Sequence, residues 1–292
     1  MVPSCLQGEI LTMKNSVCGW LLRRGVVRDL RAAGLVWLAV FACGVHALGW
    51  CGRAVLADDN ATEPKPRLLM VIAEKEYDTR RTLPAFTEAY LGDRYEIDTV
   101  TAPDEEGRNN LAGLEKAEGY DLILLSVRRR APTTQQLSAL RRYVDAGGPL
   151  VVIRTSCHAF SLRGDEPPAG HAVWDHFDTE VLGCHYANHH PNDVVTQVSR
   201  AHVASAEDAL LDGVLLPFES RGSLYLVNPL EATTNLLLLG AIEGAAAEPV
   251  AWTTHGPGGG RVFATTLGHV SDFETAAFCR LLANGISWAG GK

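Results

Sequence analysis

Short apolar runs that alternate with helical patterns constrain the fold of this chain most. Residues 67–74 (RLLMVIAE), 120–127 (YDLILLSV) and 149–156 (PLVVIRTS) contain continuous apolar runs, which are typical of strands buried on both faces of a parallel sheet. Residues 79–92 have helical spacing, and residues 133–148 add a helix that begins with the capping pattern Thr-x-x-Gln and ends in two glycines. This alternation predicts an α/β fold in which helices cover both faces of a mostly parallel sheet.

The rest of the chain is less regular. A strand is expected at 94–102, and beyond Gly164 we expect a short helix within 173–183, followed by a polar loop. Short strands are expected at 194–198, 223–227 and 235–242. Residues 249–255 and 261–267 flank a glycine-rich turn and predict a β-hairpin, and residues 272–289 predict a closing helix.

The first 57 residues differ from the rest and predict an export signal. Four arginines precede the apolar run AAGLVWLAVFACGV, and Val55 and Ala57 occupy the small-residue positions of a cleavage site after Ala57. Residues 58–65 then form a short tether, and residues 66–292 form one α/β domain. An uncleaved membrane anchor is the alternative, but His46 and three glycines weaken the run as a span of about 20 apolar residues. We therefore expect an exported protein (periplasmic or extracellular) with no stable membrane insertion after cleavage.

The charge balance limits the classes of ligand that the protein can bind, and the cysteine count limits its disulfide bonding. The chain has 26 Lys/Arg and 34 Asp/Glu, of which the first 57 residues hold six and two, so the remainder carries a net charge of −12. Such a surface repels phosphate backbones, which argues against nucleic acid and favours neutral or cationic substrates. The remainder keeps Cys157, Cys184 and Cys279, an odd number that is not a disulfide framework and leaves at least one free thiol.

Candidate site residues follow the predicted strands, because ligands of open α/β sheets bind beyond the carboxyl ends of the strands. His269 comes just after a strand and has Asp272 nearby, which favours a general base oriented by a carboxylate; the alternative is a histidine that caps the last helix. The polar segment 184–191 (CHYANHHP) offers His185 and His189 four residues apart. Imidazoles suit zinc and related metals, but the segment also fits a loop whose histidines bind substrate.

Cys157 lies beside His158 where a strand ends, and two interpretations are open. A cysteine after one strand and a histidine after a later one is the arrangement of Cys–His acyl-transfer enzymes. However, a nucleophile elbow needs flanking glycines for its tight turn, and Ser156 and His158 stand there instead. The sequence favours a pocket-lining thiol over a nucleophile.

Three segments together resemble a known family. They are YVDAGGPLVVIRTSCHAF, VLGCHYANHH and the C-terminal stretch EPVAWTTHGPGGGRVFATTLGHVSDFETAAFCRLLANGISWAGGK, which carries the specific pattern PVAW…GRVF…LGH. The chain from about Pro66 to its end is similar to the ThuA-like (trehalose-utilisation) family, and is closest to exported members. Cys184 departs from the family pattern, which tends to have a second glycine before HY.

The resemblance implies a class I glutamine-amidotransferase-like fold, a flavodoxin-like three-layer sandwich. Cys157 and His269 then fall near the places of the catalytic pair of true amidotransferases, although the ThuA-like family does not require the thiol. The family is associated with disaccharide breakdown through 3-keto-sugar intermediates, and some members hold a metal.

These expectations combine into one leading function, an exported enzyme that acts on a carbohydrate, a (keto-)glycoside, by histidine-based acid/base or metal-assisted chemistry. The predicted residues fall into three groups: catalytic His269 (base), His158 and Asp272; substrate-binding Arg154, Asn188, His189 and Tyr225; and His190 and His185 as ligands of one divalent transition metal such as Zn. The alternatives are a carbohydrate-binding or scaffolding protein without catalysis, in which Trp174, Tyr186 and Tyr225 form a sugar platform, and a Cys157–His269 hydrolase.

Overall fold

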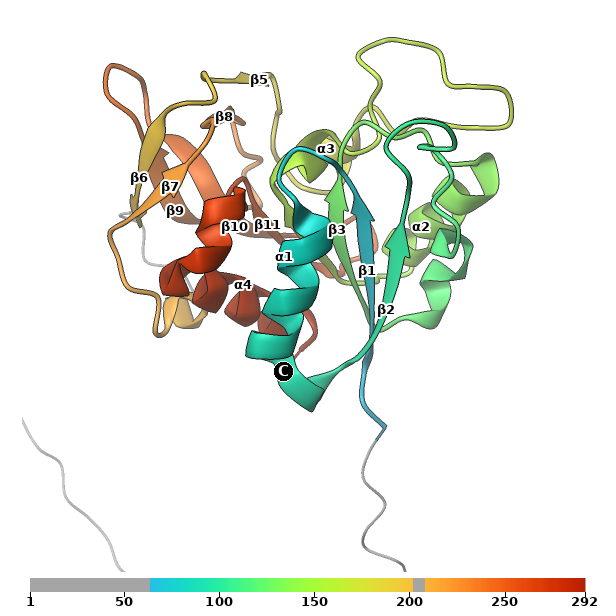
Figure 1. The fold of residues 1–292 in the computed structure, drawn as a ribbon, viewed down its shortest axis with the longest axis horizontal. Helices are drawn as coiled ribbons and strands as arrows, with labels where there is room; N and C mark the ends of the chain where they lie inside the picture. Colours follow the sequence, from blue (N-terminus) through green and yellow to red (C-terminus); the bar gives the residue numbers. More distant parts are fainter. Residues whose placement is uncertain (1–63, 202–207, 292) are drawn as a thin grey trace, which may run out of the picture. The chain divides into compact units, whose positions relative to one another are not determined.

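A computed structural model describes residues 64–201 and 208–291, which fall within one compact unit (Figure 1). The predicted export signal lies outside the described residues, as does most of the predicted tether, so both stay predictions. Among the described residues no helix is long and apolar enough to cross a membrane.

The described part of the chain forms a nine-stranded sheet in the order β2-β1-β3-β4-β11-β10-β9-β6-β7. The strands β2, β1, β3, β4 and β11 pair with one another in parallel, whereas every pairing from β11–β10 onward, through β9, β6 and β7, is antiparallel. A separate antiparallel pair joins β5 and β8. The bounds are β1 Arg67–Ala73, β2 Glu96–Thr101, β3 Leu122–Val127, β4 Leu150–Ile153, β5 Asn188–His189, β6 Val195–Arg200, β7 Phe218–Arg221, β8 Tyr225–Leu226, β9 Asn235–Ala241, β10 Glu248–His255 and β11 Arg261–Thr265.

Successive side chains of each central strand enter two different hydrophobic cores, because neighbouring residues of a strand point to opposite faces. Leu69 and Val71 of β1 join the core that α2 (Thr134–Asp145) and α3 (Phe177–Glu180) cover. Leu68 and Met70 join the core covered by α1 (Thr79–Phe86), which a π-helical turn extends as η1 (Thr87–Leu91), and by α4 (Ala276–Ala289). The result is the predicted three-layer sandwich, and the continuous apolar runs are explained by burial on both faces.

Most predicted elements are confirmed, including the capping box of α2, in which Thr133 accepts from the backbone N–H of Gln136. The closing helix starts later than predicted, because Val270–Glu274 form a separate 3-10 turn, η6, before α4 begins. The short strands β5 and β7 were not predicted, since two to four residues carry too little periodicity. Further 3-10 turns are η2 (Gly92–Arg94), η3 (Leu114–Gly119), η4 (Arg154–His158) and η5 (Asp208–Leu211).

Candidate functional site

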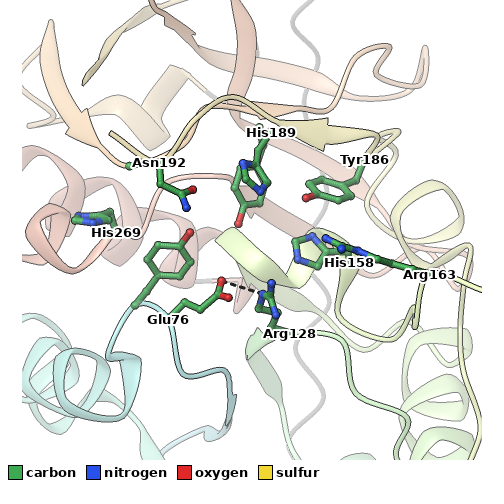
Figure 2. A pocket seen from close by; sticks show the side chains of 11 residues that line it. Glu76, Arg128, His158, Arg163, Tyr186, His189, Asn192 and His269 are labelled. Carbon is green, nitrogen blue, oxygen red and sulfur yellow. Dashed lines mark ion pairs between the residues drawn. The ribbon is translucent and has the colours of Figure 1, made fainter. Parts of the chain in front are cut away.

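A cavity of about 390 Å³ opens at the carboxyl edge of the parallel strands, as predicted (Figure 2). Loops after β1, β3, β4 and β11 supply one part of its lining, and the irregular middle of the chain supplies the rest. In chain order, the lining residues are Glu76, Tyr77, Arg128, His158, Arg163, Tyr186, His189, Asn192, Gly222, Tyr225 and His269. The cavity therefore brings together four of the predicted site residues: His158, His189, Tyr225 and His269.

His158 closes one end of the cavity and is held uncharged. Its side chain is buried, its ring centroid lies 4.2 Å from that of Tyr186, and its Nδ1 has no hydrogen-bond partner among the described residues. Burial lowers the pKa of His158 to about 2, with further contributions from Arg129 and Arg128. At neutral pH this ring is therefore uncharged, and the role of His158 as a second acid or base stays a prediction.

His269 lies at the opposite end of the cavity from His158 (Figure 2). The backbone N–H of Ser271 donates to its Nδ1 at 3.3 Å, and the hydroxyl of Ser271 lies 2.8 Å from the same nitrogen. Burial, and next the charge of Arg154, lower the pKa of His269. Because Nδ1 accepts a hydrogen bond, the proton of the neutral ring is on Nε2, as assigned from this network.

Asp272 does not orient the ring of His269, which corrects the sequence-based prediction. Its Oδ2 instead accepts hydrogen bonds from the backbone N–H groups of Gly268 (2.8 Å) and His269 (2.9 Å) and from Oγ of Ser220 (2.9 Å). The carboxylate is buried and fixes the backbone on which His269 stands. His269 caps the separate turn η6, whereas Thr275 is the N-cap of α4, so the alternative of a histidine that caps the last helix is wrong.

His189 is the third histidine at the cavity. Its Nδ1 donates a hydrogen bond, whereas Nδ1 of His269 accepts one. Its Nδ1 lies 2.7 Å from the backbone oxygen of His190, which can only accept. The proton of neutral His189 is therefore on Nδ1, and Nε2 keeps its lone pair. Asn188, the neighbouring residue of β5, lines an adjoining cavity of about 410 Å³ rather than this one.

Arg154 lies behind the aromatic wall of the cavity and does not line it. Its guanidinium stacks 4.1 Å from the ring of Tyr77 and 5.3 Å from that of Tyr225. Nη1 donates to the backbone oxygen of Thr266 at 3.0 Å, whereas Nε and Nη2 are buried without a partner among the described residues. Gly222 closes against this guanidinium, because a Cβ there would lie 2.6 Å from Nη2 of Arg154.

Sequence reasoning missed Glu76, Tyr77, Arg128 and Arg163. His158 and His269 were predicted because ligands of open α/β sheets bind beyond the carboxyl ends of the strands. The same rule applies to the first three of the missed residues, since they lie in the loops that follow β1 and β3. Buried Glu74 builds this part of the lining: its Oε2 accepts from the backbone N–H groups of Glu76 (2.6 Å) and Tyr77 (2.8 Å). Glu76 in turn pairs with Arg128 at 2.9 Å (Figure 2).

The profile of one protein family, described as trehalose utilisation, matches residues 67–289 of this chain. The chain belongs to the ThuA family. The family description indicates a sugar-related role. No curated protein matches the chain.

Two solved structures of ThuA-like proteins support this assignment at the level of the fold. The chain matches one from Parabacteroides merdae with a TM-score of 0.60 and 15% identity, over 78% of this chain and 91% of that one. It matches another, from Bacteroides uniformis, with a TM-score of 0.56 and 15% identity, over 80% of this chain and 95% of that one.

This ThuA member does not place a thiol nucleophile at its elbow. The residue directly after β4 with positive φ (46°) is Arg154, whereas Cys157 lies three residues on, inside η4. Cys157 is 1% exposed, and its thiol contacts that of Cys184, whose pKa is raised by this hydrogen bond and by burial. Cys157 lines the adjoining cavity and His269 does not, so the geometry gives the Cys157–His269 hydrolase no support.

The predicted metal ligands do not form a site either. His185 is exposed at the surface, where its Nε2 lies 3.2 Å from Oε1 of Glu231, and His190 is not among the residues that line the cavity. Within 64–201 and 208–291, no group of three His, Cys, Asp or Glu side chains is placed to hold a metal ion. The described residues of this ThuA member therefore do not fit the metal that the resemblance implied.

Proposed function

We propose that this protein is a sugar-active enzyme that acts on keto-glycosides by histidine-based chemistry. The observation that carries the proposal is the pair of opposite tautomers at one cavity: His189 presents an unprotonated Nε2 and His269 a protonated one. One ring can take a proton while the other donates a hydrogen bond to the oxygen on which charge develops. The family description, trehalose utilisation, supports a sugar as the substrate.

The proposed step begins at the carbon next to the sugar carbonyl. His189 takes a proton from this carbon through Nε2, and the electron pair of the C–H bond moves to form an enolate. His269 donates its Nε2–H to the enolate oxygen, as a neutral histidine that is polarising rather than acidic. The enolate then expels the glycosidic oxygen, and protonated His189 returns its proton to that oxygen. This division of roles revises the sequence-based assignment of His269 as the base.

The surroundings of the two histidines suit this chemistry. Uncharged His158 and the Tyr186 and Tyr225 rings give the cavity an apolar wall against which a sugar ring can pack. The Glu76–Arg128 ion pair supplies groups that hydrogen-bond hydroxyls. Low polarity around the developing charge strengthens each of these hydrogen bonds.

Exchange of the carbon-bound proton tests this proposal. Purified protein mixed with 3-keto-trehalose in deuterated water should release glucose. The remaining substrate should gain deuterium next to the carbonyl, because some enolate reverts by taking back a deuteron from His189 after its proton has exchanged with solvent; NMR follows both. His189→Ala should abolish exchange and release together. The matched control is His255→Ala, because His255 is exposed at the end of β10, where its ring makes an edge-to-face contact with Trp288, and it is not among the residues that line the cavity. Exchange and release at wild-type rates in the His189 variant would refute the proposed step.

A carbohydrate-binding protein without catalysis is the competing function, and part of its predicted platform is not available. Trp174 is buried, donates its Nε1–H to Glu180 at 2.6 Å and is covered by the guanidinium of Arg141. Calorimetry that finds sugar binding without exchange or release in the experiment above would favour this alternative.

We also propose that the first 57 residues direct export and are removed. The four arginines, the apolar run and the small residues Val55 and Ala57 support this reading. The N-terminal sequence of the protein recovered from the producing cell tests it: a start at Asp58 is expected, and an intact N-terminus in a membrane fraction would favour the anchor.

A further inference from the structure

Arginines gather at the end of the cavity that His158 closes. Arg163 lines this cavity and the two that adjoin it, of about 410 and 400 Å³. Arg129 lines both adjoining cavities, and Arg128 lines the first and the third. Figure 2 shows Arg163 beside His158 and Tyr186. A ligand that extends from the histidines past His158 therefore meets guanidinium groups.

Two of these guanidinium groups have no carboxylate partner. Arg128 pairs with Glu76, but no carboxylate of the described residues lies within ion-pair distance of Arg129 or Arg163. Nη1 of Arg129 donates to the backbone oxygen of Ser161 at 3.2 Å, and its Nε is buried without a partner. Burial lowers the pKa of Arg129, and the charge of Arg163 lowers it further. An anion placed between the two guanidinium groups would favour their charged forms and offset this lowering.

The carboxylates that share these cavities are engaged or exposed. Asp178 accepts from the backbone N–H groups of Thr179 and Tyr186, at 2.9 Å each, and burial raises its pKa. The others are at the surface: Asp165, Glu166 and Asp175. In water such carboxylates screen a neighbouring cation only weakly.

The backbone at the arginines gives an independent observation. Four non-glycine residues have positive φ within the described ranges, and three are Arg129 (47°), Arg154 (46°) and Arg163 (62°). This region is unfavourable for residues with a Cβ, and such strain concentrates at ligand sites where a side chain must be aimed. All three are located at or directly behind the cavity lining.

We propose that the substrate is a sugar that carries an oxyanion substituent, bound between Arg129 and Arg163 while the ring lies toward His189 and His269. Guanidinium groups match carboxylate, phosphate and sulfate oxygens, which is the chemistry shared by these substituents. The inference rests on the proposed function in assuming that the cavity takes a sugar. It reverses the substrate class expected from net charge, because the local arrangement of cations outweighs the bulk charge of the chain.

Calorimetry on the full protein tests the inference with glucose, glucuronate, glucose 6-phosphate and glucose 6-sulfate. The anionic sugar that fits is expected to bind at least about tenfold more tightly than glucose, since a hydrogen bond to a charged group is strong. Arg163→Gln should remove roughly tenfold of that affinity, because it removes one of the two guanidinium groups that hold the anion. Arg163 is exposed, so its replacement leaves the fold intact. The second variant is Arg129→Lys, which keeps the positive charge but loses the planar guanidinium group that can donate two parallel hydrogen bonds to one anion.

Arg142→Gln is the matched control, because Arg142 is an exposed arginine of α2 that pairs with Glu118 away from the cavities. Equal affinity for glucose and all three anionic sugars, no binding of any anionic sugar, or a preference that survives both variants would overturn the inference. Its failure is distinct from that of the proposed function. If anionic sugars bind through the arginines but keto-glycosides are not turned over, only the proposed function is refuted. If keto-glycosides are turned over but anionic sugars bind no more tightly than glucose, only the present inference is refuted.

Discussion

The backbone N–H of Ser271 donates to Nδ1 of His269 at 3.3 Å, and this contact fixes which ring nitrogen of neutral His269 carries the proton. An N–H group cannot act as an acceptor, so the tautomer does not depend on the rotation of a hydroxyl. A base at this position would need the opposite tautomer. The role that we propose for His269 thus depends on a backbone group two residues away.

Replacing His269 should lower the catalytic rate constant and leave substrate affinity nearly unchanged. We expect His269→Ala to lower kcat roughly 10²- to 10³-fold, as for loss of one oxyanion donor, with KM changed little. Ser271→Ala is the matched control: it removes the hydroxyl but keeps the backbone N–H, so it should lower kcat much less. Steady-state kinetics measures both. A large rise in KM at unchanged kcat for His269→Ala would show that His269 only binds the ground state.

Protonation of His158 should destabilise the fold as pH falls. The pKa of His158 is lowered to about 2 in the folded protein, chiefly by burial, whereas that of an unfolded histidine is about 6.5. Below pH 6.5 the unfolded chain therefore binds more protons, and stability decreases by at most about 1.4 kcal/mol per pH unit. Urea unfolding between pH 7.5 and 5 should show a steeper decline for wild type than for His158→Gln. Parallel declines would contradict the burial of an uncharged ring.

Cys157 should behave as an inert core thiol. It is 1% exposed and packs against Cys184, so iodoacetamide should label it slowly between pH 5 and 9, and Cys157→Ser should keep its activity. Mass spectrometry of tryptic peptides gives the labelling rate. Rapid labelling of Cys157 near pH 6, together with an inactive serine variant, would restore the hydrolase interpretation.

Close packing between α4 and β11 should make Gly285 sensitive to substitution. A Cβ at Gly285 would lie 2.4 Å from the ring of Phe263, which is fully buried. Gly285→Ala should therefore destabilise the protein by about 1–3 kcal/mol through overpacking. Gly119→Ala is the control, because the nearest atom there is 3.7 Å away. Urea unfolding of both variants measures the two changes in stability. Equal urea midpoints for the two variants would argue against this packing.

The sequence predicted the layers and the edge of the sheet where the site lies, because both depend on local periodicity. Runs such as Leu122–Val127 can only be buried on both faces, and the carboxyl ends of parallel strands meet at one edge. His158 and His269 were found in this way. The antiparallel continuation beyond β10 was not predicted as part of the same sheet, since strand order depends on long-range pairing.

The chemical roles of the site residues could not be predicted, because they depend on hydrogen-bond partners and on loop conformations that the local sequence does not determine. Nothing in the spacing of His269 and Asp272 shows that the carboxylate binds backbone N–H groups rather than the ring. Likewise, the tautomer of His189 depends on the carbonyl of the next residue, which a different loop conformation would turn away. The positive φ of Arg163 has no signature in composition.

The place of β11 in the sheet has a consequence for the order of folding. β11 pairs with β4, although Ile153 and Arg261 are separated by more than a hundred residues along the chain. Until the C-terminal segment is synthesised, the apolar strand β4 has one unpaired edge, which is the kind of surface that aggregates. Loop-closure entropy makes this pairing slow. We therefore expect synthesis of β11 to control the yield of soluble protein, and a chaperone that shields β4 to increase that yield.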